Sequence, residues 1–333
     1  MTETASRSAK LLIRGSTGIT RTLNLASNVR LKSGPKWNRW KTLREIPRGR
    51  VVEEQQDAVS LQWEPRAGAD RSSSIDNRLV GEQYIHLLQL GRIPYAEGLA
   101  IQKRVIDARK AGTIGDTLLL LEHPPVLTLG RNSHRENVLA SDEVLAARNV
   151  ELHEINRGGD VTYHGPGQLI GYPIFDLRGD LPGKKGPHLG PVDFMRMLEE
   201  VIIRVCYDFA VPAQRIARRT GVWTIASGSI EEKKICAMGI HVSQGITSHG
   251  FALNVTTDLR DFDLIVPCGI TDRAVTSLEL EVPPSAEPSR QPTMQNAANF
   301  TARSFGRIFE RQIVACDSME FLALLDQPAI SGK

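Results

Sequence analysis

The sequence predicts an α+β fold with a mixed, largely antiparallel sheet packed by helices. Two observations lead to this prediction. Stretches with helical apolar spacing mix with short apolar runs typical of strands, and no strict strand–helix–strand order recurs along the 333 residues. Apolar residues make up 41% of the chain, which is enough to bury a sizeable core without disulfides or metals.

Three helices are expected. The first covers residues 95–111 and has Leu99, Val105 and Ile106 among its apolar positions. The second begins at Gly190-Pro191, where proline suits the first turn. Its apolar stripe follows the i, i+3, i+4, i+7, i+8, i+11 pattern through Phe194, Met197, Leu198, Val201, Ile202 and Val205. The third is expected over residues 294–314.

The strands are predicted from apolar runs bounded by turn residues. They cover residues 117–122, 126–130, 169–177, 222–226, 235–242 and 251–255. Pro124 and Pro125 mark a turn or an edge between the first two, because proline cannot donate to the hydrogen-bond ladder and two in succession are not expected in a strand interior. Four prolines between residues 283 and 292 predict a linker or surface loop.

Residues 1–80 are predicted to be a basic, disordered extension, with a separate folded domain over 81–333. Residues 1–50 carry 12 Lys and Arg against two acids, so the net charge of +3 combines +10 here with −7 in the rest of the chain. The extension could be a floppy tail or a misplaced start, an organellar transit peptide, or a nucleic-acid-binding arm. The acidic remainder is a poor candidate for a nucleic-acid binder.

Composition and motifs exclude several classes of protein. The longest apolar run is far below the roughly 18 residues of a membrane helix. The four cysteines form no CxxC pair, no HExxH motif occurs, and no signal peptide opens the chain, so we expect no metal and a cytoplasmic location. Neither a P-loop nor a dinucleotide-binding glycine motif is present.

A glycine-rich segment over residues 157–168 is the densest chemical signal. It contains four glycines together with arginine, threonine, tyrosine, histidine and glutamine. Glycine lets the backbone approach a ligand closely, and successive N–H groups can hold an oxyanion or a carbonyl. Two linked hairpin turns are the alternative interpretation. Because plain turns seldom carry that set of polar side chains, we interpret the segment as a substrate cradle.

A lysine pair lies at the entry of the apolar strand at 235–242. Lys233 and Lys234 point to opposite faces if the strand is regular, so one of them can turn inward. A desolvated lysine is suited to base chemistry. A solvated strand end is the commoner alternative.

Cys268 lies between Pro267 and Gly269, after an apolar run that predicts a strand ending in a turn. A turn can display a thiol, and a nearby cation would make it a nucleophile. An inert buried cysteine is the alternative, and it suits Cys206, which lies on the helix that carries the apolar stripe.

At these residues the sequence closely resembles the lipoyl(octanoyl) transferase family. Four blocks, spread over roughly residues 85–280, carry the resemblance. They are Glu122-His123-Pro124-Pro125-Val126 with Thr128 and Gly130-Arg131; Arg157–Gln168 with Tyr172-Pro173; Lys234–Gly239; and His249–Asn254 through Pro267–Ile270. Cys236 and Met238 depart from the more usual Ala and from Ile or Leu, and residues 1–80 are not covered.

The resemblance implies a fold like that of biotin and lipoate–protein ligases and a catalytic acyltransferase domain over 81–333. Cys268 would be the acyl-thioester nucleophile, and Lys234 would lower the pKa of its thiol. The residues that would bind the acyl substrate are Arg157, Gly158, Gly159, Asp160, Val161, Thr162, Tyr163, His164, Ala237, Met238, Gly239, Gly250, Phe251 and Ala252.

The same resemblance implies the reaction and its partners. An octanoyl group would pass from acyl carrier protein to a lysine of the lipoyl domains of 2-oxoacid dehydrogenase and glycine cleavage complexes, in lipoate biosynthesis. No cofactor, nucleic acid or membrane would take part, and the location would be mitochondrial if the source is eukaryotic. An ATP-dependent lipoate– or biotin–protein ligase of the same fold is the alternative, and a non-catalytic acyl-binding module is a weaker one.

Overall fold

The computed structural model describes residues 83–184, 186–226, 231–266 and 274–326, all within one compact unit of the chain. The predicted extension over residues 1–80 and the cysteine at 268 lie outside the described residues. Among the described residues, no helix is long and apolar enough to cross a membrane.

Helices and strands alternate without a regular repeat, as the sequence predicts. The strands are β1 (Tyr84–Arg92), β2 (Asp116–Glu122), β3 (Val126–Leu129), β4 (Glu151–Glu154), β5 (Val161–His164), β6 (Gln168–Ile174), β7 (Ala213–Ile216), β8 (Arg219–Thr224), β9 (Lys234–Ser243), β10 (Ile246–Asn254) and β11 (Gln312–Ala315). The α-helices are α2 (Tyr95–Ala111), α3 (Asp142–Ala147), α4 (Pro191–Asp208), α5 (Leu278–Glu281), α6 (Met294–Phe309) and α7 (Ser318–Leu325), and the short 3-10 helices are η1 (Arg135–Asn137), η2 (Leu259–Leu264) and η4 (Pro288–Arg290).

The strands form two sheets. The larger has the order β11-β1-β2-β6-β10-β9-β8-β7, in which β1 is parallel to both of its neighbours and every other pairing is antiparallel. The smaller has the order β4-β3-β5, with one parallel and one antiparallel pairing. The predicted α+β class with a mixed, largely antiparallel sheet is therefore confirmed.

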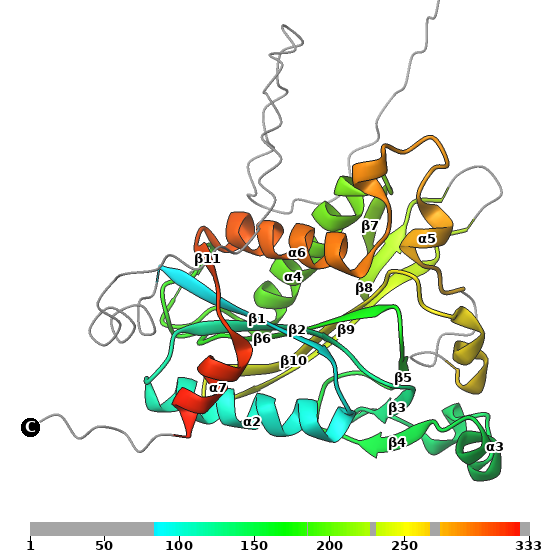
Figure 1. The fold of residues 1–333 in the computed structure, drawn as a ribbon, viewed down its shortest axis with the longest axis horizontal. Coiled ribbons are helices and arrows are strands. Elements are labelled where there is room, and N and C mark those ends of the chain that lie inside the picture. Colours follow the sequence, from blue (N-terminus) through cyan, green and yellow to red (C-terminus); the bar gives the residue numbers. More distant parts are fainter. Residues whose placement is uncertain (1–82, 185, 227–230, 267–273, 327–333) are drawn as a thin grey trace, which may run out of the picture. The chain divides into compact units, whose positions relative to one another are not determined.

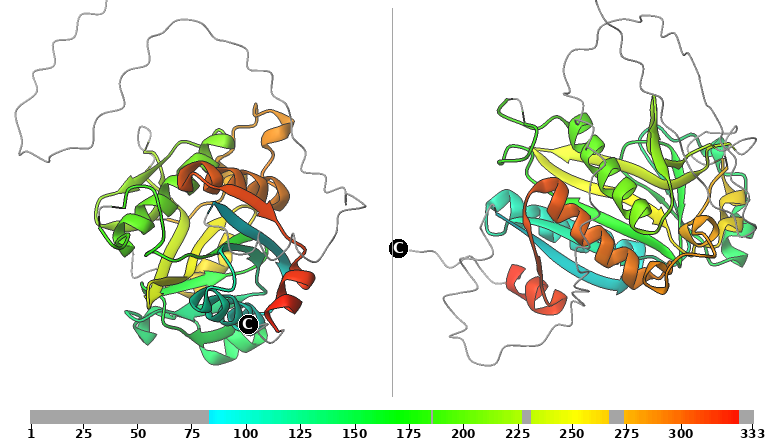
Figure 2. Two further views of the ribbon diagram at one scale, coloured as in Figure 1. Left: turned by 90° about the vertical axis from the view of Figure 1, so that its left-hand side faces the viewer. Right: turned by 90° about the horizontal axis from the view of Figure 1, so that it is seen from above.

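Helices cover both faces of the larger sheet (Figures 1 and 2). On one face, α4 and α6 pack a core that includes Phe175, Phe194, Phe305 and Phe309. Neighbouring rings in this group have centroids 4.8–6.1 Å apart. On the other face, α2 and α7 pack a second core. A third cluster fills the space between the smaller sheet and η2. The predicted stripe of α4 is buried at nearly every position, as an amphipathic helix requires.

Two predictions of local structure were wrong. The helix expected to reach residue 314 ends at Phe309, where Glu310 adopts a left-handed conformation with φ of 53°. The residues that follow form β11, which pairs with β1 in parallel, so a tertiary contact overrides the helical pattern. The segment 157–168, for which no strand was predicted, contains β5, which pairs with β3.

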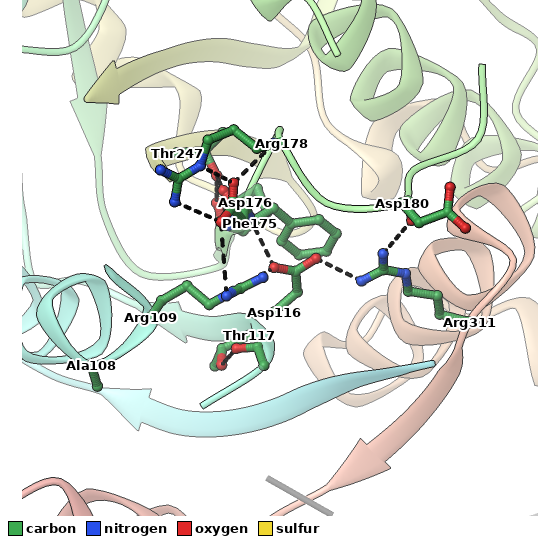
Figure 3. A network of polar contacts seen from close by, with 12 residues as sticks. Ala108, Arg109, Asp116, Thr117, Phe175, Asp176, Arg178, Asp180, Thr247 and Arg311 are labelled. Carbon is green, nitrogen blue, oxygen red and sulfur yellow. Dashed lines mark hydrogen bonds and ion pairs between the residues drawn. The ribbon is translucent and has the colours of Figure 1, made fainter. Parts of the chain in front are cut away.

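An ion network closes the end of the larger sheet where β2 begins (Figure 3). The Asp116 carboxylate accepts hydrogen bonds from Arg109 Nε at 2.9 Å and Arg311 Nη1 at 2.7 Å, and its side chain is 1% exposed. It also accepts the backbone N–H of Asp176 at 2.9 Å. The network therefore joins α2, β2, the end of β6 and the start of β11.

Candidate active site

A cavity lies where β5, β6, β9 and β10 meet the first turn of α2. It encloses about 470 Å³ of empty space, part of it open to solvent. Its lining comes from widely separated segments: Tyr95, Arg157, Gly159, Thr162, His164, Ile170, Tyr172, Ala237, Met238, Gly239, His249, Gly250, Phe251 and Ala252. A smaller adjoining cavity shares Thr162 and Ala237 with it and reaches Lys234.

Glycines allow the strands and the 157–160 turn to approach each other closely. Gly158 donates its backbone N–H to Ile240 of β9 at 3.1 Å, and a Cβ on Gly239 would collide with the carbonyl oxygen of Gly158. Gly159 has φ of +91°, a conformation that favours glycine. This turn is therefore held directly against the strand that forms one wall of the cavity.

Arg157 brings a buried cation to the cavity. The residue is 8% exposed, and its Nη2 donates to the Thr128 carbonyl at 2.7 Å and to the Thr128 hydroxyl at 3.0 Å. Its Nη1 donates to the carbonyl of Gly158 at 3.0 Å. These contacts fix the orientation of the guanidinium at the wall of the cavity.

His164 is neutral and has a defined tautomer. Burial, reinforced by the charges of His123 and Arg157, lowers the pKa of His164 to about 3. Gln168 donates its amide to the Tyr163 carbonyl at 3.2 Å and to Asn254 at 2.9 Å, so its Oε1 accepts from His164 Nδ1 at 2.8 Å. The hydrogen-bond network therefore assigns the ring proton to Nδ1 and leaves Nε2 as an acceptor.

Two further histidines and two tyrosines surround His164. The Tyr95 ring stacks on it at 6.2 Å, and His123 Nε2 accepts from the Tyr172 hydroxyl at 2.8 Å because its Nδ1 donates to a backbone carbonyl. Burial lowers the pKa of His123 and, together with Arg157, lowers that of His249 to about 4. Burial also raises the pKa of both tyrosines. These groups are all neutral near pH 7.

Lys234 is buried, whereas Lys233 is not. Lys234 is 7% exposed and lines the smaller cavity, while the partly exposed Lys233 forms an ion pair with Glu281 at 3.1 Å. Backbone hydrogen bonds of 2.9 Å join Lys234 to Ala274 and Thr276. The expectation that one of the two lysines faces inward is confirmed.

The charged side chains described in the lining of the two cavities are positive. Within the described residues it includes the cations Arg157 and Lys234 and contains no aspartate or glutamate. Buried cations and neutral hydrogen-bonding groups suit an anion that develops during a reaction, such as a thiolate or an oxyanion. Ala, Met, Phe and Ile side chains beside them suit an alkyl chain.

Comparison with known proteins decides the family. Residues 94–306 match the lipoyl protein ligase A/B catalytic domain. An octanoyltransferase of Acidobacterium capsulatum is 64% identical over 234 residues, which cover 70% of this chain and 94% of that protein. An octanoyltransferase of Koribacter versatilis is 48% identical over 72% of this chain and 89% of its own length.

The chain belongs to the lipoyl(octanoyl) transferase family. It is accordingly an enzyme, an acyltransferase. Solved structures share the fold of this transferase at lower identity. The bi-partite lipoate protein ligase of Thermoplasma acidophilum has a TM-score of 0.52 and 16% identity, covering 74% of this chain and 92% of that chain. A lipoate-protein ligase A bound with ATP has a TM-score of 0.51 and 15% identity over the same shares.

Most of the residues expected to bind substrate in the transferase lie together at the larger cavity. They are Arg157, Gly159, Thr162, His164, Ala237, Met238, Gly239, Gly250, Phe251 and Ala252. Of the two residues expected to be catalytic, Lys234 reaches the adjoining cavity and Cys268 lies outside the described residues.

The side chains of Asp160, Val161 and Tyr163 are directed elsewhere. Because side chains alternate along β5, Thr162 and His164 face the cavity while Val161 and Tyr163 pack into the core of the smaller sheet. The Tyr163 hydroxyl donates to Asp261 at 2.6 Å, and Asp160 accepts from Asn137 Nδ2 at 2.5 Å. These three residues and Gly158 are not among the residues that line the cavity, and their expected role in binding stays a prediction.

Sequence reasoning missed several residues of the transferase cavity. Tyr95, Ile170, Tyr172 and His249 line it, although none was among the expected binding residues. Tyr172 and His249 lie in the blocks that carry the family resemblance, so the signal was present. Tyr95 opens α2 and has no motif around it, and only the tertiary structure reveals it.

Proposed function

We propose that the protein transfers an octanoyl group from octanoyl-acyl carrier protein to a lysine of lipoyl domains in lipoate biosynthesis. The acceptors would be the lipoyl domains of 2-oxoacid dehydrogenase and glycine cleavage complexes. The names of the relatives support octanoyl transfer. The observation that carries the proposal furthest is a pair of adjoining cavities, one with apolar walls and the buried Arg157 and the other reaching the buried Lys234.

The proposed reaction proceeds through a thioester on Cys268. The Cys268 thiolate attacks the carbonyl carbon of the donor thioester, and a new C–S bond forms as the donor's C–S bond breaks. The donor leaves as a thiolate and takes up the proton that the Cys268 thiol had given up. The lysine amine of the acceptor then attacks the same carbon, the amide forms, and the Cys268 thiol is released. Neither step needs an oxidant, a metal or ATP, because the donor is already an activated acyl group.

Lys234 and Arg157 have distinct roles in this proposal. Lys234 stabilises the Cys268 thiolate as a cation or removes its proton as a base. Its backbone is hydrogen-bonded to Ala274, six residues beyond Cys268 in the chain, which supports its assignment to this cysteine. Arg157 contributes positive potential at the cavity, where negative charge develops on the carbonyl oxygen.

The test is transfer without ATP. Purified protein, octanoyl-acyl carrier protein and a lipoyl domain are mixed, and the mass of the lipoyl domain is followed with and without ATP. We expect the added mass of one octanoyl group per domain at equal rates in both. Transfer that occurs only with free octanoate and ATP would contradict the proposal and favour the ligase alternative.

Two cysteine variants sharpen this test. Cys268→Ala should abolish transfer, whereas Cys316→Ala, a partly exposed cysteine in the described structure, should retain it. Near-native turnover by Cys268→Ala would rule out the thioester route and leave direct transfer between the two substrates.

A further inference from the structure

Trp223 and Lys234 are cross-strand partners at the junction of β8 and β9. Trp223 pairs with Lys234, while the preceding Val222 pairs with Cys236, so one step along β8 corresponds to two along β9. Side chains alternate between faces, and such a shift changes which face a side chain takes. The irregularity therefore brings Lys234, and not Ile235, opposite the Trp223 side chain.

The lysine lies close to the aromatic ring. Lys234 Nζ is 4.9 Å from the centroid of the Trp223 ring, within the range of about 6 Å for a cation–π contact. Trp223 is 1% exposed and Lys234 is 7% exposed, so water screens the contact little. Tryptophan is the strongest aromatic partner for a cation, and desolvation strengthens the attraction further.

Gly221 lies beside the lysine side chain. It has φ of +116°, and an added Cβ would lie 2.6 Å from the Cys236 carbonyl oxygen and 3.7 Å from Lys234 Cε. Any larger residue would push the strands apart. The lysine stem is therefore confined on one side by the strand backbone and at its end by the indole ring.

We propose that Trp223 is a positioning residue of the acyl transfer, whose ring face holds the Lys234 ammonium in place and favours its protonated form. This inference rests on the proposed function, in which Lys234 acts on Cys268. It deepens that function, because a lysine kept protonated stabilises the thiolate as an ion pair and is a poor general base in the first step.

Other charged and titratable groups near Lys234 come from several elements. Arg219 of β8 lies 5.9 Å from the same ring, Cys236 lies on β9 itself, and Glu199 of α4 accepts the backbone N–H of Gly221. The neighbouring Lys233 pairs with Glu281 of α5 at 3.1 Å. All of these groups remain unchanged in a Trp223 variant, so a comparison at Trp223 isolates the ring.

The test reads the lysine amine directly. The protein is treated with trace acetic anhydride over a range of pH, and acetylation of Lys234 is quantified by peptide mass spectrometry against exposed lysines. Only the unprotonated amine reacts. The pH of half-maximal reactivity therefore reports how strongly the site favours the protonated form of the Lys234 amine. This readout does not depend on acylation of Cys268.

Two variants are compared with the unaltered protein. Trp223→Leu removes the ring face, and Trp223→Phe keeps a weaker one. Trp223 Nε1 has no hydrogen-bond partner among the described residues, so the phenylalanine variant removes no described hydrogen bond. Phe209→Leu, a fully buried aromatic residue in the α4–α6 core, is the matched control for lost packing.

The direction of the expected change in Lys234 reactivity distinguishes loss of the ring face from loss of packing alone. Trp223→Leu should lower the half-maximal pH and raise Lys234 reactivity about 2- to 30-fold at a fixed pH below it, with Trp223→Phe between and Phe209→Leu unchanged. If the leucine variant does not fold, the phenylalanine variant alone decides. An unchanged or raised half-maximal pH in the folded variants would overturn the inference, because admitted water stabilises the ammonium instead.

Failure of this inference differs visibly from failure of the proposed function. If Lys234 acetylation is the same in the Trp223 variants and the unaltered protein while transfer occurs without ATP, only the proposed role of the ring is wrong. If the acetylation shifts as expected but no acyl transfer occurs, the proposed reaction is wrong and the effect of Trp223 on Lys234 stands.

Discussion

Lys233 and Lys234 are adjacent in the chain, but their side chains lie in different surroundings. Lys233 is 37% exposed at its side chain and pairs with Glu281, whereas Lys234 turns into the cavity region. An exposed ion pair contributes little to stability, and a buried cation at a reaction site can contribute much to rate. Substitutions at the two positions should therefore have unlike effects.

We predict that Lys234→Ala slows acylation of Cys268 and raises the pH at which its thiol is alkylated. An unassisted thiol has a pKa of about 8.5, so it is mostly protonated near neutrality. The measurement is the rate of iodoacetamide labelling at Cys268 against pH, read by peptide mass. The pH profile of Lys233→Ala should match that of the unaltered protein. Lys234→Arg keeps the charge but is a poor base, so it separates ion pairing from proton removal. Identical pH profiles for Lys234→Ala and the unaltered protein would show that Lys234 does not assist ionisation of the Cys268 thiol.

We also predict that stability falls with acidification because of the buried histidines. Burial places the pKa of His164 at about 3 and that of His249 at about 4, both below the ordinary value of about 6.5. The unfolded chain therefore binds more protons below pH 6.5. The free energy of unfolding is fully retained above that pH and is lost as the pH falls toward 4, by up to about 1.4 kcal/mol per pH unit for each histidine.

Urea unfolding between pH 7 and pH 4.5 checks the pH effect. His164→Gln should remove one proton from the difference between the folded and unfolded states and so flatten the pH dependence. A slope that is the same in the variant and in the unaltered protein would show that His164 is not held neutral by the fold.

At the scale of elements, the ion network around Asp116 holds together parts of the sheet that are distant in sequence. Asp116 begins β2, Arg109 ends α2, and Arg311 precedes β11, which itself pairs with β1. Both arginine side chains are largely buried, at 14% and 5% exposure. Removal of one partner from such a network leaves buried charge without compensation.

Asp116→Ala should accordingly lower the free energy of unfolding by about 3–5 kcal/mol. The matched control is Asp107→Ala, which breaks an exposed pair with Lys103 on α2 and should cost less than about 0.5 kcal/mol. Denaturant unfolding measures both. Similar losses for the two variants would mean that the Asp116 network contributes no more than a surface pair.

Local signals predicted some elements well and others poorly, for identifiable reasons. The predicted helix over 95–111 has the bounds observed for α2, because its pattern ends at Gly112, which caps the helix in a left-handed conformation. β11 was taken for helix because Ile313 and Val314 continue an apolar pattern, and only pairing with β1 makes them a strand. β5 was not predicted because glycines flank it on both sides, although Val161, Thr162 and Tyr163 favour strands.

At the scale of the whole molecule, the candidate active site is assembled from segments that the sequence keeps far apart. The cavity joins residues of three stretches that carry the family resemblance, 157–172, 234–239 and 249–254. The motifs in these stretches did not predict which side chains face it, because that depends on the alternation along β5 and the register shift beside Lys234. Tyr95 enters the site only through the packing of α2 against β6 and β10.

We predict that a protein lacking residues 1–75 retains acyl transfer. The matched family domain covers residues 94–306, and no expected site residue precedes 157. The measurement is the initial rate of octanoyl transfer by the shortened protein, with circular dichroism as the check that it folds. A folded but inactive shortened protein would assign the basic segment a direct part in the reaction, such as attraction of an acidic donor.

The proposed reaction depends on Cys268 carrying the octanoyl group between donor and acceptor. The intact mass of the protein is measured after brief mixing with octanoyl-acyl carrier protein in the absence of acceptor, followed by peptide mapping. We expect the added mass of one octanoyl group, located on Cys268, which disappears when a lipoyl domain is added. An enzyme that transfers octanoyl groups yet never carries one, or carries one on another residue, would contradict the proposed reaction.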